Sequence, residues 1–252
     1  MHPSGPPPGP APRILRSGGL SARVRPWPRQ PTLAHLVTLD QQMPLPSVLL
    51  NGWLRELGDQ GYERVRTGAL SPSHRLPYDA LGFTLAQELA LLHLDLRHRG
   101  ARGPAATSRG DVVLRRAKAD ELDALARVDE AAFPPGWGLD AAGLLDAARA
   151  TPRSRVRVAL VDGRIAGIAI TGRSATASFL QRLAVHPDAR RAGLASALVA
   201  DSIAWARRRR CRTMAVNTQS DNTPALSLYL RHGFEPSATQ LVVLERSLSG
   251  VQ

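Results

Sequence analysis

Residues 183–195 have the residue types of a turn that binds an anion. The stretch reads Leu-Ala-Val-His-Pro-Asp-Ala-Arg-Arg-Ala-Gly-Leu-Ala, which predicts a strand that ends at Val185 and a helix that begins near Gly193. The first N–H groups of a helix have no partner within it, and the helix dipole adds positive charge there. Gly193 lets the backbone approach a ligand closely, and Arg190 and Arg191 are cationic. This pattern indicates a diphosphate site, although a plain strand-to-helix turn with a glycine would look the same.

A second stretch, residues 222–234, begins after one further expected helix and one further expected strand. It reads Asn-Thr-Pro-Ala-Leu-Ser-Leu-Tyr-Leu-Arg-His-Gly-Phe. Together the two stretches resemble the GNAT superfamily of acetyl-CoA-dependent N-acetyltransferases. Arg190-x-x-Gly193-x-Ala195 is similar to the pyrophosphate loop of that family, with alanine in place of its second glycine. The second stretch is similar to the motif that follows this loop, and the resemblance covers about residues 111–249.

The resemblance implies a role toward acetyl-CoA for each matching residue. The backbone of Leu183 and Val185 would hold the acetyl carbonyl and the pantetheine arm, and Asn222 would hydrogen-bond the pantetheine. Tyr229 would protonate the departing CoA thiolate, because a phenol at the end of the cofactor arm can supply a proton during acyl transfer to an amine. The alternative is a tyrosine that only packs. The residues assigned to cofactor binding are Leu183, Ala184, Val185, Arg190, Arg191, Ala192, Gly193, Leu194, Ala195 and Asn222.

The sequence assigns no general base. Many relatives place a carboxylate on the central strand, but no Asp or Glu occurs between Gly163 and Pro187. Gln181 cannot take up a proton, whereas His186 could, although a histidine at the end of a strand is more often structural. The carboxylates that could act through water are Asp129, Glu130 and Asp140.

The chain after residue 110 shows the strand and helix patterns that can position these groups. Apolar residues recur with a helical period in residues 194–210, and Asp162-Gly163 is a strong signal for a hairpin. The expected strands are 112–116, 156–161, 165–171, 179–185, 213–218 and 240–248, and the expected helices are 119–133, 139–151, 194–210 and 223–232. This order predicts an α/β domain, and the resemblance implies the GNAT fold, with a central mixed, mostly antiparallel sheet flanked by helices.

The N-terminal part contains a weaker copy of the same pattern. The spacing Tyr-x-x-x-Gly-Phe occurs at residues 78–83 and again at residues 229–234, and residues 32–97 are interpreted as a smaller, degenerate GNAT-like α/β half-domain. Residues 40–46, where a pyrophosphate loop belongs, contain no glycine and no arginine, so this copy should not bind a cofactor. A half-domain exposes a sheet edge, so we expect it to pack on the complete domain or on a second copy of the chain in a homodimer.

Two segments are expected to lie outside the folded parts. Residues 1–31 hold nine of the twenty prolines, with arginines and no acid, which predicts a disordered tail. Residues 98–110 are rich in Gly, Ala and Arg, which predicts a linker. The catalytic domain would then comprise residues 111–249.

The composition favours a soluble, cytoplasmic protein. The 252 residues include 33 Lys and Arg and 21 Asp and Glu, giving a net charge of +12 that both halves of the chain share, so nucleic-acid binding is not expected. The single cysteine, Cys211, excludes an intrachain disulfide and a cysteine-cluster metal site, and no metal is expected. No run of about 18 uncharged apolar residues occurs, so no membrane span is expected.

The expected function is acetyl transfer from acetyl-CoA to a primary amine of a small molecule or protein, by direct attack in a ternary complex. One alternative is a protein N-terminal acetyltransferase of the ribosomal-protein alanine type. Phe133 and Trp137 lie where relatives open their acceptor site, which is a weak hint in its favour, and ordinary packing explains them equally well. The other alternative is a non-catalytic acetyl-CoA-binding regulatory protein, favoured by the missing base and the degenerate copy.

Overall fold

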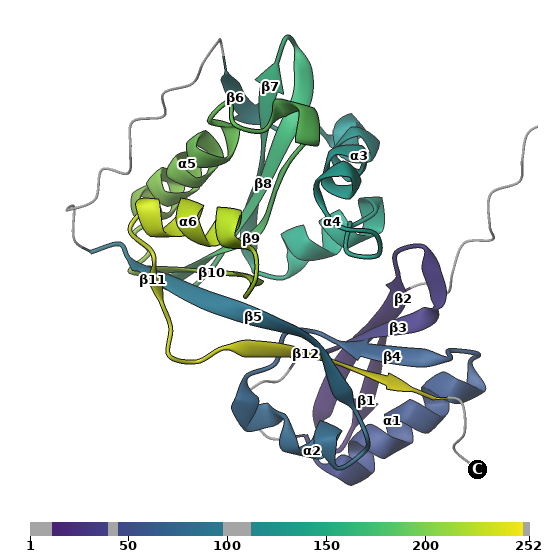
Figure 1. Ribbon diagram of the computed structural model, residues 1–252. Helices are drawn as coiled ribbons and strands as arrows, with labels where there is room; N and C mark the ends of the chain where they lie inside the picture. The colour runs from purple at the N-terminus through teal and green to yellow at the C-terminus, as the bar shows by residue number, and fades with distance from the viewer. Residues whose placement is uncertain (1–11, 40–44, 98–111, 249–252) are drawn as a thin grey trace, which may run out of the picture. The chain divides into compact units, whose positions relative to one another are not determined.

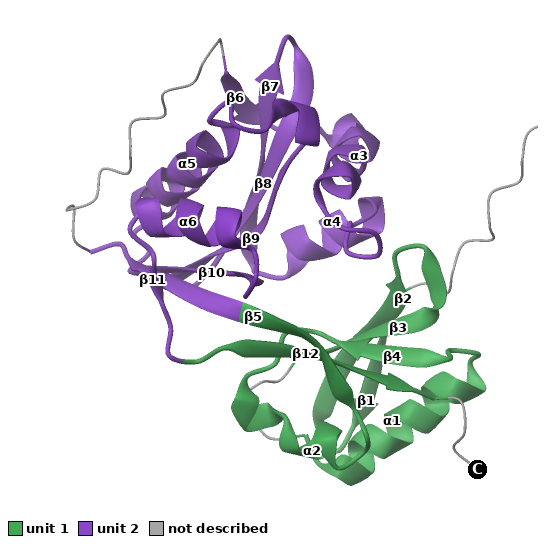
Figure 2. Ribbon diagram, in the orientation of Figure 1, with its two compact units in different colours: residues 1–89, 239–252 green, residues 90–238 purple. Residues whose placement is uncertain are grey.

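The structure, a computed structural model, describes residues 12–39, 45–97 and 112–248. The chain divides into two compact units (Figure 2). Unit 1 comprises Met1–Leu89 and Thr239–Gln252, and unit 2 comprises Ala90–Ala238. Unit 2 contains all the residues that the sequence analysis assigned to chemistry.

Unit 2 is a sheet with α3 and α4 on one face and α5 and α6 on the other (Figure 1). Its elements are the second half of β5 (Thr84–Asp95), β6 (Val113–Arg116), α3 (Leu122–Ala132), α4 (Ala141–Arg149), β7 (Arg153–Val161), β8 (Arg164–Ser174), β9 (Ala177–Val185), α5 (Leu194–Arg208), β10 (Thr213–Gln219), α6 (Thr223–Arg231) and β11 (Glu235–Pro236). The strand order is β5-β10-β9-β8-β7-β6, with β11 paired to β5. Neighbours from β6 to β9 are antiparallel, whereas β9 and β10 are parallel. The predicted mixed, mostly antiparallel sheet flanked by helices is confirmed.

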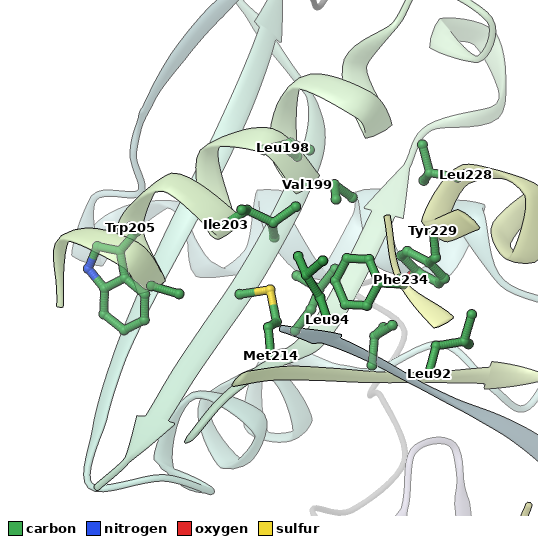
Figure 3. Close-up of a cluster of buried hydrophobic side chains, with 14 of the residues drawn as sticks. Leu92, Leu94, Leu198, Val199, Ile203, Trp205, Met214, Leu228, Tyr229 and Phe234 are labelled. Carbon is green, nitrogen blue, oxygen red and sulfur yellow. The ribbon is translucent and has the colours of Figure 1, made fainter. Parts of the chain in front are cut away.

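Alternation along the strands divides the apolar side chains of unit 2 between two cores. On β7, Val158 belongs to the core under α3 and α4, whereas its neighbour Ala159 belongs to the core under α5 and α6, and both are fully buried. Each large side chain buried in this way contributes about 1.5–3 kcal/mol. The second core is shown in Figure 3, where the labelled side chains are Leu92, Leu94, Leu198, Val199, Ile203, Trp205, Met214, Leu228, Tyr229 and Phe234.

Unit 1 is a smaller sheet covered by α1. Its elements are β1 (Arg13–Ser17), β2 (Leu20–Trp27), β3 (Gln30–Thr38), α1 (Ser47–Asp59), β4 (Arg64–Thr67), α2 (Leu76–Asp79), the first half of β5, and β12 (Leu241–Ser247). The strand order is β1-β2-β3-β4-β12-β5. Leu50, Trp53 and Leu54 of α1 pack in one buried cluster with Val65 and Leu244 of the sheet.

The expectation of a disordered tail is wrong for residues 13–31. These residues form β1, β2 and the start of β3. Leu20, Ala22 and Val24 point into the core of unit 1, and a serine and an arginine alternate with them along β2. This two-residue period is typical of a half-buried strand. The prediction of disorder depended on the high content of proline and arginine and did not consider this period.

The C-terminal strand completes unit 1 and not the unit that precedes it in the sequence. β12 pairs with β4 and with the first half of β5, so the expected catalytic domain of residues 111–249 loses its last strand. The second half of β5, expected within the half-domain of residues 32–97, belongs instead to unit 2, where it pairs with β11. Each unit is therefore completed by a strand from the other part of the sequence.

The apolar pattern did not reveal this exchange, because the two strands are similar. Residues 89–92 read Leu-Ala-Leu-Leu and residues 241–244 read Leu-Val-Val-Leu, so they are nearly equal in shape and hydropathy. The apolar pattern therefore does not indicate which sheet each strand completes. The expected linker, residues 98–110, and the first part of the expected tail, residues 1–11, lie outside the described residues.

Candidate functional site

In the described residues, the central strand β9 pairs with β10 over only the first part of its length. β10 pairs with β9 at the start of both strands, where Thr213–Ala215 lies beside Ala177–Phe179. Further along, the ladder that the described residues form with β9 is the one with β8, and it continues to Val185. Backbone N–H and C=O groups need partners, so the other edge of β9 at Leu183-Ala184-Val185 can bind an extended ligand.

The turn after β9 leads to a helix N-terminus without a side-chain cap. The chain passes through a 3₁₀ turn, Pro187–Ala189, and enters α5 at Gly193, which has a φ of 83° and offers no capping side chain. Arg191 also has a positive φ, 67°, which is uncommon for a residue with a Cβ. The first N–H groups of α5, those of Leu194 and Ala195 among them, are therefore available to an anion.

The two arginines of this turn have different surroundings. Arg190 Nη2 donates to the carbonyl oxygen of Ala132, 3.0 Å away, and so ties the turn to the end of α3. Arg191 is exposed. Ala192 and Ala195 pack against the core under α5. The structure thus gathers the predicted phosphate-binding residues in one turn, and it gives Arg190 a contact that the sequence did not indicate.

Helix α6 carries the two remaining predicted residues. Asn222 is its N-cap, and Oδ1 of Asn222 accepts the N–H of Ala225 at 3.2 Å. Tyr229 is 4% exposed, and its ring centroid lies 5.7 Å from that of Phe234 (Figure 3). Burial raises the pKa of the Tyr229 phenol above 10.0, and the charge of Arg182 opposes this shift. The phenol is therefore protonated at neutral pH, so it can donate a proton and cannot serve as a base.

A buried ion pair lies on the other face of β9, and the sequence analysis did not identify it. Nε and Nη2 of Arg182 donate to Oδ2 and Oδ1 of Asp129 over 2.7 and 2.6 Å, and Asp129 is fully buried. The pairing of β9 with β8 contains a β-bulge at this point. Arg182 lies opposite Ile170 and Leu180 lies opposite the next residue of β8, so Gln181 is the extra residue of the bulge. The two partners are 53 positions apart, and no local pattern links residues at that separation.

The expected candidates for a general base are engaged in other ways. Asp129 is held by Arg182 in the ion pair. Oδ1 of Asp140 caps α4 by accepting a backbone N–H at 2.7 Å. Nδ1 of His186 lies 3.4 Å from a backbone N–H of the following turn. Glu130 is exposed on α3. These positions do not identify a base.

Residues 122–234 match the acetyltransferase (GNAT) family. The chain carries a GNAT acetyltransferase domain. Within the described part of the chain, no group of three His, Cys, Asp or Glu side chains could hold a metal ion. No helix in those same residues is long and apolar enough to cross a bilayer.

The similarity of this chain to solved structures extends beyond that domain. A tandem GNAT protein from the clavulanic acid biosynthesis pathway is 16% identical, with 97% of this chain and 86% of that chain covered and a TM-score of 0.68. A GCN5-related N-acetyltransferase from Kribbella flavida is also 16% identical, with coverages of 93% and 89% and a TM-score of 0.61. One from Sphaerobacter thermophilus is 17% identical, with coverages of 91% and 76% and a TM-score of 0.59. These similarities show the fold: a GNAT domain with a second GNAT-like half. No curated protein matches the chain.

Proposed function

We propose that the GNAT domain transfers an acetyl group from acetyl-CoA to a primary amine by direct attack in a ternary complex. The observation that carries the proposal is the sequence of features along one strand. Among the described residues, the ladder of β10 with β9 does not reach Leu183–Val185, and the next helix after the 3₁₀ turn is α5, with its uncapped N-terminus at Gly193. A ligand with an extended arm and a diphosphate needs both features, in this order.

Acetyl-CoA would supply an activated thioester, and the residues of this chain would bind and orient it. The backbone of Leu183, Ala184 and Val185 would hold the acetyl carbonyl and the pantetheine arm. The amide nitrogen of Asn222 would donate to a carbonyl of that arm, since Oδ1 is used as the cap of α6. The residues that would bind the diphosphate are Arg190, Arg191, Ala192, Gly193, Leu194 and Ala195.

Tyr229 would act as the acid. The amine nitrogen bonds to the carbonyl carbon, the C–S bond breaks, and the sulfur takes the phenolic proton of Tyr229. The nitrogen releases one proton to solvent, and the Tyr229 phenolate recovers one from solvent. No described side chain near β9 is assigned as a base, so the amine would attack in its neutral form.

The acceptor and the cellular setting are further proposals. We propose that the acceptor is a primary amine on a small molecule or a protein. We also propose a cytoplasmic location, because a chain with one cysteine forms no intrachain disulfide and disulfides are rare in that compartment. A non-catalytic acetyl-CoA-binding protein is the second candidate. It is favoured by the burial of Tyr229, whose exposure of 4% is that of a packing residue.

The test is the release of CoA thiol in the presence of a panel of primary amines. Tyr229→Phe keeps the ring and removes the proton donor, so turnover should fall by roughly 10²–10⁴-fold while acetyl-CoA affinity changes little. Tyr78→Phe is a matched control, because Tyr78 is also buried and packs against Phe83 with a centroid separation of 5.2 Å, but in unit 1. Cys211 is buried and should add little background to a thiol reagent.

Three outcomes are informative. Turnover that is lost in Tyr229→Phe and kept in Tyr78→Phe supports the proposal. Equal turnover in both variants means that water protonates the thiolate and that Tyr229 only packs. Binding of acetyl-CoA without turnover on any amine supports the non-catalytic alternative.

A further inference from the structure

We infer that Arg182 and Asp129 form a clamp that holds residues 133–139 against β9, and that this clamp positions the acceptor amine. The inference rests on the proposed function, because Arg182 ties residues 133–139 to β9 beside Leu183, whose backbone is proposed to hold the acetyl carbonyl. It adds a positioning residue, Arg182, to the residues proposed to bind acetyl-CoA.

The ion pair contacts the segment at its beginning, middle and end. The ring of Phe133 covers the guanidinium of Arg182, with the guanidinium carbon 3.5 Å from the ring centroid. Nη2 of Arg182 donates to the carbonyl oxygen of Trp137 at 2.9 Å. Oδ1 of Asp129 accepts the N–H of Leu139 at 2.7 Å. One guanidinium and one carboxylate therefore fix both ends of the segment and the turn between them.

The segment is itself shaped to lie close to α3. Gly136 has a φ of 81°, which favours glycine over any residue with a Cβ. A Cβ added at Gly138 would lie 2.9 Å from Cα of Glu130, so the segment approaches the backbone of α3 more closely than any other residue type allows. The two prolines that precede Gly136 limit the other conformations open to the chain.

The chemistry of the pair favours a positioning role. The Arg182 side chain is 16% exposed and that of Asp129 is fully buried, and desolvation makes such pairs weak contributors to stability compared with apolar residues of the same volume. A bidentate arginine fixes the orientation of its partner, because its planar guanidinium fits one carboxylate geometry. Arg182 is also next to Leu183 in β9, so the clamp joins residues 133–139 to the strand proposed to hold the acetyl carbonyl.

The clamp can be tested on the full chain with two readouts. The first is a comparison of the KM for the amine, kcat and the Kd of acetyl-CoA. The second is the rate at which chymotrypsin cleaves after Trp137, which reports release of the segment without reference to activity. The control is Arg115→Lys, because Arg115 pairs with Glu121 at 2.8 Å in the same unit and makes no described contact with residues 133–139.

Arg182→Lys keeps the charge and loses the planar fork. We expect the KM for the amine and the rate of cleavage after Trp137 each to rise about tenfold or more, because charge-assisted hydrogen bonds are lost. The Kd of acetyl-CoA should stay within about twofold of the wild type, and Arg115→Lys should change none of these quantities. A wild-type KM and cleavage rate in Arg182→Lys would overturn the clamp.

A neutral pair keeps the inference testable where a single variant does not fold. In the double variant Asp129→Asn with Arg182→Gln, no buried charge is left unpaired, and the two amides can still bond to each other. This variant should fold, be cleaved faster than the wild type and show a raised KM; wild-type values would again overturn the clamp. If the wild type acetylates no amine, the proposed function fails, whereas the cleavage rates still decide whether the clamp exists.

Discussion

Nε2 of His232 lies 2.8 Å from Oγ of Ser196 and joins the end of α6 to the first turn of α5. His232 is 1% exposed, and burial lowers the pKa of its imidazole, with the charge of Arg231 adding to the effect. The histidine is therefore neutral at pH 7. Ser196 follows Gly193 in α5 and His232 follows Tyr229 in α6, so this bond links the two helices proposed to bind the cofactor and to supply the acid.

Removing one member of this bond should cost stability. Ser196→Ala leaves a buried ring nitrogen of His232 without its partner, so the free energy of unfolding should fall by about 1–3 kcal/mol in urea titrations. The double variant Ser196→Ala with His232→Leu removes both polar partners. Its free energy of unfolding should fall by less than the sum of the falls in Ser196→Ala and in His232→Leu. Strictly additive losses would show that the bond contributes nothing.

The pH dependence of turnover should reflect the amine and not Tyr229. Because no base is assigned, kcat/KM should rise with pH until the acceptor amine is neutral. Burial raises the pKa of Tyr229 above 10.0, so ionisation of this acid should cause no decline below about pH 10. A decline well below pH 10 that Tyr229→Phe abolishes would contradict this account of the acid.

Unit 1 should be sensitive to acid through His35. Burial lowers the pKa of His35 from 6.5 to about 3, and the charges of Arg25, Arg23 and Arg66 add to the shift. The unfolded chain then binds a proton at a higher pH than the folded chain, so stability falls as the pH drops from 6.5 toward 3, by up to about 1.4 kcal/mol per unit. His35→Gln should lose less stability between pH 7 and pH 5 than the wild type. An equal loss in urea titrations would rule out this group as the cause.

Two glycines should respond to alanine in opposite ways. Gly138→Ala brings a Cβ to 2.9 Å from Cα of Glu130, so backbone must shift and the melting temperature should fall, by the equivalent of about 1–3 kcal/mol. Gly52 lies within α1 with nothing within 4 Å of the added Cβ, so Gly52→Ala should stabilise by about 0.5–1 kcal/mol. A loss of similar size in both variants would contradict the close approach at Gly138.

The elements with a strong period were predictable from the sequence. The helix expected at residues 194–210 is α5, Leu194–Arg208, and the strand expected at 179–185 lies within β9, Ala177–Val185. Here the apolar period and the local turn residues agree with the tertiary structure. The same agreement places Gly193 at the N-terminus of α5 and Asn222 at that of α6.

What the sequence did not reveal depends on contacts between distant residues. The exchange of β12 and the second half of β5 depends on which of two similar strands each sheet accepts, and periodicity carries no information about that choice. The Arg182–Asp129 pair is another example. The lack of acids in residues 163–187 predicts a missing base, whereas in the structure this stretch supplies Arg182, which holds Asp129 of α3.

The binding of acetyl-CoA at the N-terminus of α5 is tested most directly by thermal or calorimetric titration of the wild type, Gly193→Glu and Gly193→Ala. A ligand that binds only the folded state at one hundred times its Kd stabilises by about 2.7 kcal/mol, and the wild type should show this shift. Gly193→Glu puts a negative side chain where the diphosphate is proposed to lie, so it should abolish the shift. Gly193→Ala, which adds only strain at a φ of 83°, should keep part of it. An unchanged shift in Gly193→Glu, or no shift in the wild type at millimolar acetyl-CoA, would contradict the account.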